Sequence, residues 1–225
     1  MSDTDQIEMN RAGILDRIAR TAQEHGRRPD AVELVAVSKR QPDERIDAML
    51  AAGQRVFGEN RVQEAQQHWA ERRNTCPDLE LRLIGPLQTN KTADAVALFD
   101  VIETLDREKL ARHLAEEMAR QGRTLRLYVQ VNTGEEGQKS GVTPAELPGF
   151  LETCRTTYGL EIEGLMCIPP VEQPAGLHFA LLAKLAKENG VARLSMGMSG
   201  DFETAIALGA SSVRVGSALF GERNA

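Results

Sequence analysis

Short apolar, β-branched runs alternate along the chain with longer segments of helical spacing. The runs cover residues 34–37, 56–58, 81–84, 101–104, 125–131, 162–168, 194–197 and 213–216. Segments between them, such as 42–53, 107–122 and 201–210, repeat apolar residues three and four positions apart, as on one face of a helix. This pattern predicts eight strands, each followed by a helix or a loop. An additional helix is expected over residues 7–25, before the first strand.

Alternating strands and helices imply βαβ units and a parallel sheet. Eight such units in 225 residues predict an α/β protein with a (β/α)8 TIM barrel. An open, doubly wound sheet is the rival fold, but no GxGxxG follows any of the runs, which weakens its dinucleotide-binding form. The sequence has no linker or low-complexity segment, so we expect a single domain over residues 1–225.

Charge and cysteine content restrict the partners and the compartment. The net charge is −6, from 27 basic and 33 acidic residues without a basic block, which argues against nucleic-acid and membrane-surface binding. The three cysteines form no CxxC pair, which suits free thiols in a reducing compartment. The first ten residues, MSDTDQIEMN, lack the apolar segment of a signal peptide. We therefore expect a cytoplasmic protein.

Polar and small residues follow the predicted strands, where barrels of this type carry their functional sites. The candidates after the first, second, sixth, seventh and eighth strands are Lys39, Asn60, Met166, Ser199, and Gly216 with Ser217. Small and hydroxyl residues between a strand and a helix leave N–H groups that can bind a phosphate. The alternative is a plain helix cap at Ser199 and a turn glycine at Gly216, although two such neighbouring loops favour a phosphate. The strand interiors are expected to be apolar.

Lys39 and Arg214 suggest the kind of ligand. A lysine is nucleophilic only when neutral, and burial or a nearby cation lowers its pKa from about 10.4. An amine facing a phosphate site fits either a sugar phosphate bound as a Schiff base or pyridoxal phosphate bound as an internal aldimine. In SSVRVGS, strand alternation separates Arg214 from Val213 and Val215. An inward Arg214 could donate to a pyridine nitrogen or bind substrate. The alternatives are that Arg214 is a surface arginine and that Lys39 is a surface lysine.

Other signals are weaker. GEEGQKSG lacks the GxxxxGK[ST] spacing of a phosphate-binding loop, so Lys139 is assigned to an active-site or surface loop. The four histidines (His25, His68, His113, His178) have no metal-ligand spacing. We expect them to be solvent-facing helix residues and expect no metal site. Trp69 and the three cysteines are expected to be packing residues.

Seven motifs together resemble one family. AVSK, FGENRVQE, IGPLQTNK, GQKSG, GLMCIPP, LSMGMSGDFETAI and VRVGSALFG resemble, in order and spacing, the motifs of the pyridoxal phosphate homeostasis proteins over about residues 30–223. The fold of that family is similar to the barrel domain of bacterial alanine racemase. Two positions depart from the family pattern: Arg82 stands where a histidine is expected, and Gly200 stands where an aspartate is common.

The resemblance implies a cofactor and its ligands. Lys39 would carry pyridoxal 5′-phosphate as a Schiff base, Asn60 would lie beside the ring, and Arg214 would face the pyridine nitrogen. The residues that would hold the phosphate are Ser199, Gly216 and Ser217, with the backbone near Met198. Met166 and Lys139 are accessory candidates, and the resemblance gives Lys139 no definite role.

The resemblance also bears on catalysis. Racemisation needs a base on each face of the cofactor, and alanine racemase takes its second base, a tyrosine, from a partner chain. The two tyrosines here, Tyr128 and Tyr158, fall within a predicted strand and a helical stretch. We therefore expect no catalytic residue and a carrier that stores pyridoxal phosphate and delivers it to apo-enzymes, with effects on amino-acid and keto-acid balance. It would be a monomer or weak homodimer; the alternatives are an amino-acid racemase and a cofactor-free, aldolase-type enzyme.

Overall fold

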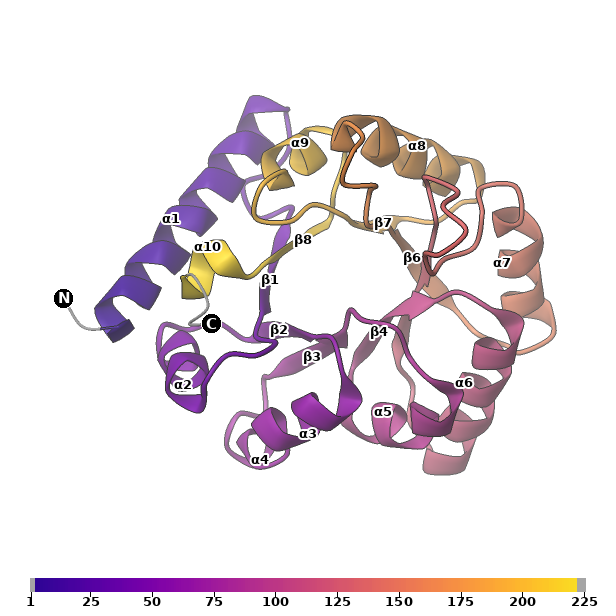
Figure 1. The fold of residues 1–225 in the computed structure, drawn as a ribbon, viewed down its shortest axis with the longest axis horizontal. Helices are drawn as coiled ribbons and strands as arrows, with labels where there is room; N and C mark the ends of the chain where they lie inside the picture. Colours follow the sequence, from indigo (N-terminus) through magenta and orange to yellow (C-terminus); the bar gives the residue numbers. More distant parts are fainter. Residues whose placement is uncertain (1–2, 222–225) are drawn as a thin grey trace.

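The eight predicted strands all form, and they close into one parallel barrel with the helices outside it (Figure 1). The structure, a computed structural model, describes residues 3–221. The strands follow each other around the ring in chain order, and the last pairs with the first. They are β1 Glu33–Val37, β2 Val56–Glu59, β3 Glu80–Leu83, β4 Val101–Leu105, β5 Arg126–Gln130, β6 Ile162–Met166, β7 Arg193–Ser195 and β8 Ser212–Val215. The predicted TIM barrel is confirmed.

Helices follow the strands and form the outer layer (Figure 1). They are α1 Asp3–Glu24, α2 Asp43–Ala51, α3 Val62–Trp69, α4 Arg72–Thr75, the 3-10 helix η1 Thr89–Lys91, α5 Thr92–Leu98, α6 Glu108–Gln121, α7 Leu147–Thr156, α8 Ala175–Glu188, α9 Phe202–Ala207 and α10 Ser217–Phe220. The expected N-terminal helix over 7–25 is present and already formed at Asp3. Within residues 3–221, no helix is long and apolar enough to cross a membrane. The single domain over 1–225 stays a prediction, and residues 1–2 and 222–225 lie outside the described part.

The main apolar core lies between the barrel wall and the helices. Alternate strand residues point outward, because successive side chains of a strand point to opposite faces. Phe57 of β2 is one of these, and its ring packs 4.5 Å from the ring of Trp69 on α3. Both side chains are fully buried, as are Cys154 on α7 and Cys167 after β6, which confirms their packing role. Cys76 is only partly buried.

The barrel interior is charged, so the expectation of apolar strand interiors is wrong. Arg82 of β3 is completely buried there and pairs with Glu33 of β1, Glu80 of β3 and Glu103 of β4. The cause is strand alternation. Of two successive residues in a strand, the apolar one points outward to the helices and the next points into the barrel. Paired charges make this burial tolerable, because each inward cation has carboxylate partners.

Helix α1 lies across the place where the barrel closes (Figure 1). Arg17 pairs with Glu203 of α9 at 2.9 Å, and its guanidinium lies 4.6 Å from the ring centroid of Phe202. The Asn10 amide donates to the Leu219 carbonyl of α10 at 2.9 Å. On the other side, Arg11 donates to Gln54 between α2 and β2 at 3.1 Å. The additional helix therefore joins the first and the last units of the barrel.

Candidate functional site

Lys39 is half-buried and follows β1 at the mouth formed by the carboxyl ends of the strands. β1 pairs with β8 in a register that places Ala36 beside Val215. Gly216 is therefore next to Val37, and a Cβ built on Gly216 would lie 3.4 Å from the Val37 Cβ. Since Lys39 comes two residues after Val37, the lysine and Gly216 leave the same rim of the barrel on adjacent strands.

Three groups from the loops after β7 and β8 converge at that rim. The Gly216 N–H donates to the Ser199 hydroxyl at 3.4 Å, and the Ser217 hydroxyl lies 3.4 Å from the same oxygen. These distances are long for hydrogen bonds, which are usually about 2.7–3.0 Å. The two hydroxyls can therefore turn to a stronger acceptor, such as a phosphate oxygen. The sequence prediction that these three residues lie together is consistent with this geometry.

The helix-cap alternative for Ser199 is wrong. The residue before α9 is Asp201, and its carboxylate accepts the Met198 N–H at 2.6 Å within the loop. Ser199 thus has no capping role and stays directed to Gly216 and Ser217. The N–H of Met198, which was a phosphate candidate, is already donated to Asp201, and the Met198 side chain is partly exposed.

Arg214 of β8 points into the barrel, so the surface alternative for this residue is wrong. Only 4% of the residue is exposed. Its guanidinium donates to the Ser195 hydroxyl at 2.6 Å and to the Cys167 carbonyl at 2.8 Å. Arg214 lies beside Val35, two residues deeper along the strands than Gly216. Its place is therefore the floor of the mouth, below the three converging groups.

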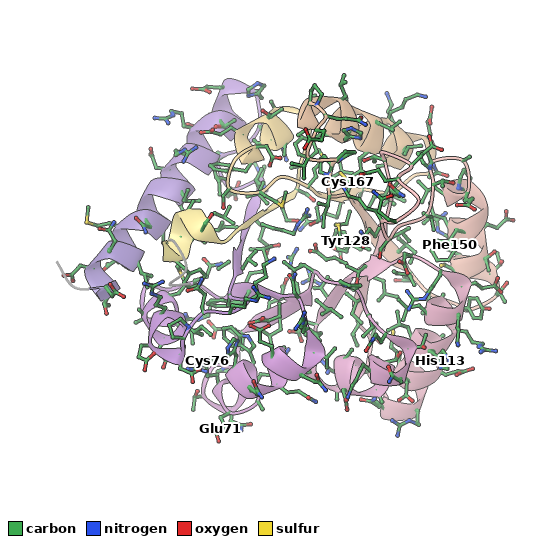
Figure 2. The ribbon with its side chains drawn as sticks, in the orientation of Figure 1. Glu71, Cys76, His113, Tyr128, Phe150 and Cys167 are labelled. Carbon is green, nitrogen blue, oxygen red and sulfur yellow. The ribbon has the colours of Figure 1, made fainter. Side chains whose placement is uncertain are left out.

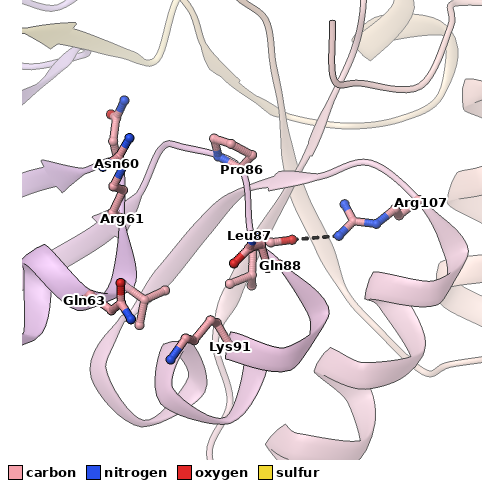
Figure 3. A pocket seen from close by; sticks show the side chains of 9 residues that line it. Asn60, Arg61, Gln63, Pro86, Leu87, Gln88, Lys91 and Arg107 are labelled. Atoms are coloured by element: carbon pink, nitrogen blue, oxygen red, sulfur yellow. Dashed lines mark hydrogen bonds between the residues drawn. The ribbon is translucent and has the colours of Figure 1, made fainter. Parts of the chain in front are cut away.

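Asn60 follows β2 and borders a cavity of about 690 Å³ (Figure 3). The lining comes from the loops after β2, β3 and β4: Asn60, Arg61, Val62, Gln63, Pro86, Leu87, Gln88, Lys91 and Arg107. Arg107 donates to the Leu87 carbonyl at 2.7 Å (Figure 3), and it also pairs with Asp106 at 2.5 Å. Lys91 lies 3.6 Å from Asp94. Two of the three cations in the lining therefore already have acidic neighbours.

The accessory candidates lie apart from this group. Met166 is fully buried and packs with Val101 and Tyr128 inside the barrel (Figure 2 labels Tyr128). Lys139 is on the loop after β5, where its amine contacts Glu136 at 2.6 Å and the Pro169 carbonyl at 3.4 Å. β5 is the fifth strand of the closed ring, across from β1. The structure therefore places Lys139 on the opposite side of the mouth from Lys39.

The prediction of four solvent-facing histidines is wrong for His178 and His68. The ring of His178 is buried, with Nδ1 3.1 Å from the Thr133 hydroxyl and Nε2 3.0 Å from the Gln173 side chain. His68 lies on the face of α3 that packs on the barrel, 3.0 Å from Glu59. The hydrogen bond to Glu59 raises the pKa of His68 against the opposing effect of burial. Helical position alone did not predict which face these residues take.

Glu59 is a supporting residue that the sequence places at a strand end without indicating its role. It is fully buried at the end of β2, and one carboxylate oxygen, Oε1, accepts hydrogen bonds from Ser38 at 2.7 Å and from Trp69 at 3.0 Å. The same oxygen contacts His68. These contacts fasten the residue before Lys39 to α3. The signal was present as strand alternation, which turns Glu59 to the same side as Phe57.

Glu59 also belongs to the only group in residues 3–221 whose ligand atoms could hold a metal ion. The other members are Glu64 and His68, and the three ligand atoms lie within 4.8 Å of one another. The contacts of Glu59 to Ser38, His68 and Trp69 give this group a hydrogen-bonding role. The absence of a metal site stays a prediction.

Comparisons with known proteins agree with this fold and these motifs. The family model described as "Alanine racemase, N-terminal domain" matches residues 9–224. Proteins named "Pyridoxal phosphate homeostasis protein" from Vibrio cholerae and Pseudomonas aeruginosa are each 41% identical to this chain. The alignments cover 97% of this chain and 97% and 96% of those proteins, respectively.

Solved structures extend the comparison to three dimensions. PipY of Synechococcus elongatus, solved with PLP bound, is 39% identical, with a TM-score of 0.77 over 91% of this chain and all of that one. An alanine racemase from Clostridium difficile has a TM-score of 0.73 at 14% identity and matches over 98% of this chain but 58% of its own, which shows the fold alone. Full-length identity, the barrel and the motifs at its rim agree on one assignment: this chain belongs to the family of pyridoxal phosphate homeostasis proteins, with the fold of the alanine racemase N-terminal domain.

Proposed function

We propose that this chain binds pyridoxal 5′-phosphate at the carboxyl-end mouth of its barrel and acts in the homeostasis of that cofactor, storing it and delivering it. The observation that carries the proposal is that Lys39 leaves β1 next to β8, at the rim where the hydroxyls of Ser199 and Ser217 meet above Arg214. The names of the relatives and the PLP-bound PipY structure support the same cofactor.

Each residue has a role that its chemistry allows. Lys39 would be the covalent anchor, because a neutral lysine amine can condense with the aldehyde of the cofactor and release one water. The Gly216 N–H and the hydroxyls of Ser199 and Ser217 donate to phosphate oxygens. The missing side chain at Gly216 keeps the space beside Val37 open. Asn60 would lie beside the ring.

Arg214 would meet the pyridine nitrogen of the cofactor. A guanidinium is permanently charged and only donates hydrogen bonds, so it favours a ring nitrogen without a proton. When bound, pyridoxal phosphate supplies an electron sink for reactions at the α-carbon of amino acids. An unprotonated ring weakens that sink, which suits a protein that holds the cofactor without using it.

The two tyrosines support a carrier without catalysis. Burial raises the pKa of Tyr128 to about 12 against the pull of Arg82, and its ring lies inside the barrel (Figure 2). Tyr158 follows α7 and donates to Glu108 at 2.8 Å. Neither tyrosine is suited to be the second base that a racemase needs. We infer that the protein transfers its cofactor to apo-enzymes, as a monomer or weak homodimer in the cytoplasm.

The test is the absorbance spectrum of the purified protein, followed by borohydride reduction and mass mapping. We expect a yellow protein, with a pyridoxyl adduct on Lys39 after reduction. Lys39→Ala should lose the colour and the adduct, whereas Lys184→Ala, on the exposed face of α8, should keep both. A colourless wild-type protein that takes up no added pyridoxal phosphate would end the proposal, and so would an adduct that maps to another lysine.

Catalysis is tested separately. The loaded protein is incubated with L-amino acids in deuterated water, and deuterium at the α-carbon is measured by mass spectrometry. Incorporation that depends on Lys39 would favour the racemase alternative. A carrier should show none, and it should restore the activity of an apo-enzyme that requires pyridoxal phosphate.

A further inference from the structure

A continuous chain of buried polar contacts runs from the floor of the mouth to the centre of the barrel. Arg214 donates to the Ser195 hydroxyl at 2.6 Å, and Ser195 donates to Glu103 Oε2 at 2.6 Å. The other oxygen of that carboxylate, Oε1, accepts from Arg82 at 3.2 Å. Glu103, Ser195 and Arg82 are completely buried, and Arg214 is nearly so. These contacts are therefore shielded from bulk solvent.

The direction of each hydrogen bond follows from the groups themselves. A guanidinium only donates, and an ionised carboxylate only accepts. The Ser195 hydroxyl has one proton, so it accepts from Arg214 and gives its own proton to Glu103. Glu103 Oε2 also lies 4.0 Å from the Arg214 guanidinium, close enough for direct attraction. The carboxylate therefore holds Arg214 in two ways, by charge and through the serine.

Arg214 is not fully occupied by these contacts. A guanidinium carries five N–H donors, and the described contacts of Arg214 use one on each of its terminal nitrogens, to Ser195 and to the Cys167 carbonyl. Because both acceptors lie on neighbouring strands or their ends, they fix the plane of the group. The donors that remain are available to a ligand in the mouth.

We propose that Glu103 is a positioning residue, which holds Arg214 through Ser195 so that its free N–H groups meet the pyridine nitrogen of the cofactor. This inference rests on the proposed function, because it concerns the same site. It also gives a role to the departure at Arg82, since Arg82 occupies the second oxygen of Glu103 and leaves only Oε2 for Ser195. Glu103 and Ser195 do not touch the ligand themselves.

The test uses pyridoxal phosphate labelled with nitrogen-15 in the ring, bound to the full-length protein. The readouts are the nitrogen-15 chemical shift and the dissociation constant. Glu103→Gln cannot accept on both oxygens, and Ser195→Ala breaks the connection, so both should move the ring-nitrogen shift in the same direction. Both should also weaken binding about tenfold, the usual weight of one hydrogen bond to a charged group.

Glu80→Gln is the matched control. Glu80 accepts from Arg82 at 2.7 Å, as Glu103 does at 3.2 Å, but it makes no described contact with Arg214 or Ser195. Its variant should cost stability and leave the ring-nitrogen shift at the wild-type value. An equal shift in Glu80→Gln would overturn the inference, because any loss of charge in the barrel would then have the same effect.

The remaining outcomes are also decisive. If Glu103→Gln does not fold, Ser195→Ala carries the test, since Ser195 makes no described contact with Arg82. An unchanged ring-nitrogen shift in Ser195→Ala, with the cofactor bound, would refute the positioning role while leaving the proposed function intact. Failure of the wild-type protein to bind the labelled cofactor would instead refute the proposed function.

Discussion

Glu59 and Glu64 show how single residues set the position of the proposed anchor lysine. Glu59 binds Ser38 on one side of Lys39, and the Glu64 carboxylate accepts the backbone N–H of Arg40 on the other. Arg40 has a φ of 58°, in the left-handed region that non-glycine residues seldom adopt. Two acidic side chains from one neighbouring segment thus hold the turn that carries Lys39.

The pair of His68 and Glu59 predicts a pH dependence of stability. The folded pKa of His68 is raised above its unfolded value of about 6.5, so its contribution is complete below that value and is lost as pH rises through the folded pKa. Each unit of difference is worth about 1.4 kcal/mol. The stability advantage of wild type over His68→Gln should therefore be constant below about pH 6.5 and shrink as the pH rises above it.

Urea unfolding at several pH values measures this difference. His25→Gln is the control, because His25 is exposed just after α1 and its described hydrogen bond is to the local Thr21 carbonyl. An advantage over His68→Gln that grows with pH would contradict the prediction.

At the scale of elements, the sequence predicted all eight strands but not the charged network that they enclose. Hydrophobic runs identify strands because their outward residues must pack on helices, and that face was apolar as expected. The inward face of Arg82, Glu103 and Arg214 could not be read as a network, because each charge is stable only with partners from distant strands. Motifs placed Lys39, Ser199 and Ser217 at one rim, since strand ends are local features.

The strand ends were predicted less well than the strands. The run over 162–168 gives a strand that stops at Met166, and the run over 194–197 gives one that stops at Ser195. Cys167 and Met196, just beyond them, are buried in loops at the mouth, so their apolar character reflects packing without strand pairing, whereas Ile168 is exposed. Asn60 and Glu59 were likewise adjacent in sequence, yet they point to different environments.

The loops after β2 and β3 are in direct backbone contact, which predicts a sensitive glycine. A Cβ on Gly85 would lie 2.2 Å from the Asn60 carbonyl oxygen, far inside contact distance. Gly85→Ala should therefore displace Asn60 and destabilise the protein by about 1–3 kcal/mol. Thermal and urea unfolding measure the loss.

Gly200→Ala is its counterpart on the loop after β7. No heavy atom lies within 4 Å of a Cβ built there, so this variant should unfold like wild type. Equal stability of Gly85→Ala and wild type would show that the two loops can separate without cost.

At the scale of the molecule, the charged interior predicts how the fold responds to acid. Burial by itself would raise the pKa of Glu80, but Arg82 and Arg126 outweigh it and lower the pKa. Stability from this carboxylate is therefore present above its unfolded pKa of about 4.3 and is lost as pH falls through the folded value. Glu80→Gln should cost about 1.5–3 kcal/mol at pH 7, and less as the pH falls below 4.

Unfolding by urea between pH 3 and 7 checks this dependence. The exposed Glu161, which has no described ion pair, provides the control variant Glu161→Gln. A cost of Glu80→Gln that stays constant down to pH 3 would show that the interior carboxylate does not titrate with folding.

The closure of the barrel between β1 and β8, with α1 lying across it, has a consequence for the whole chain. Lys39 belongs to the earliest barrel unit and Ser217 to the latest, and α1 reaches over both through Arg11 and Asn10. A ligand bound by both Lys39 and Ser217 would link the first and the last units of the barrel. Ligand binding would then stabilise the closed barrel, and the ligand-free protein would open most easily between β1 and β8.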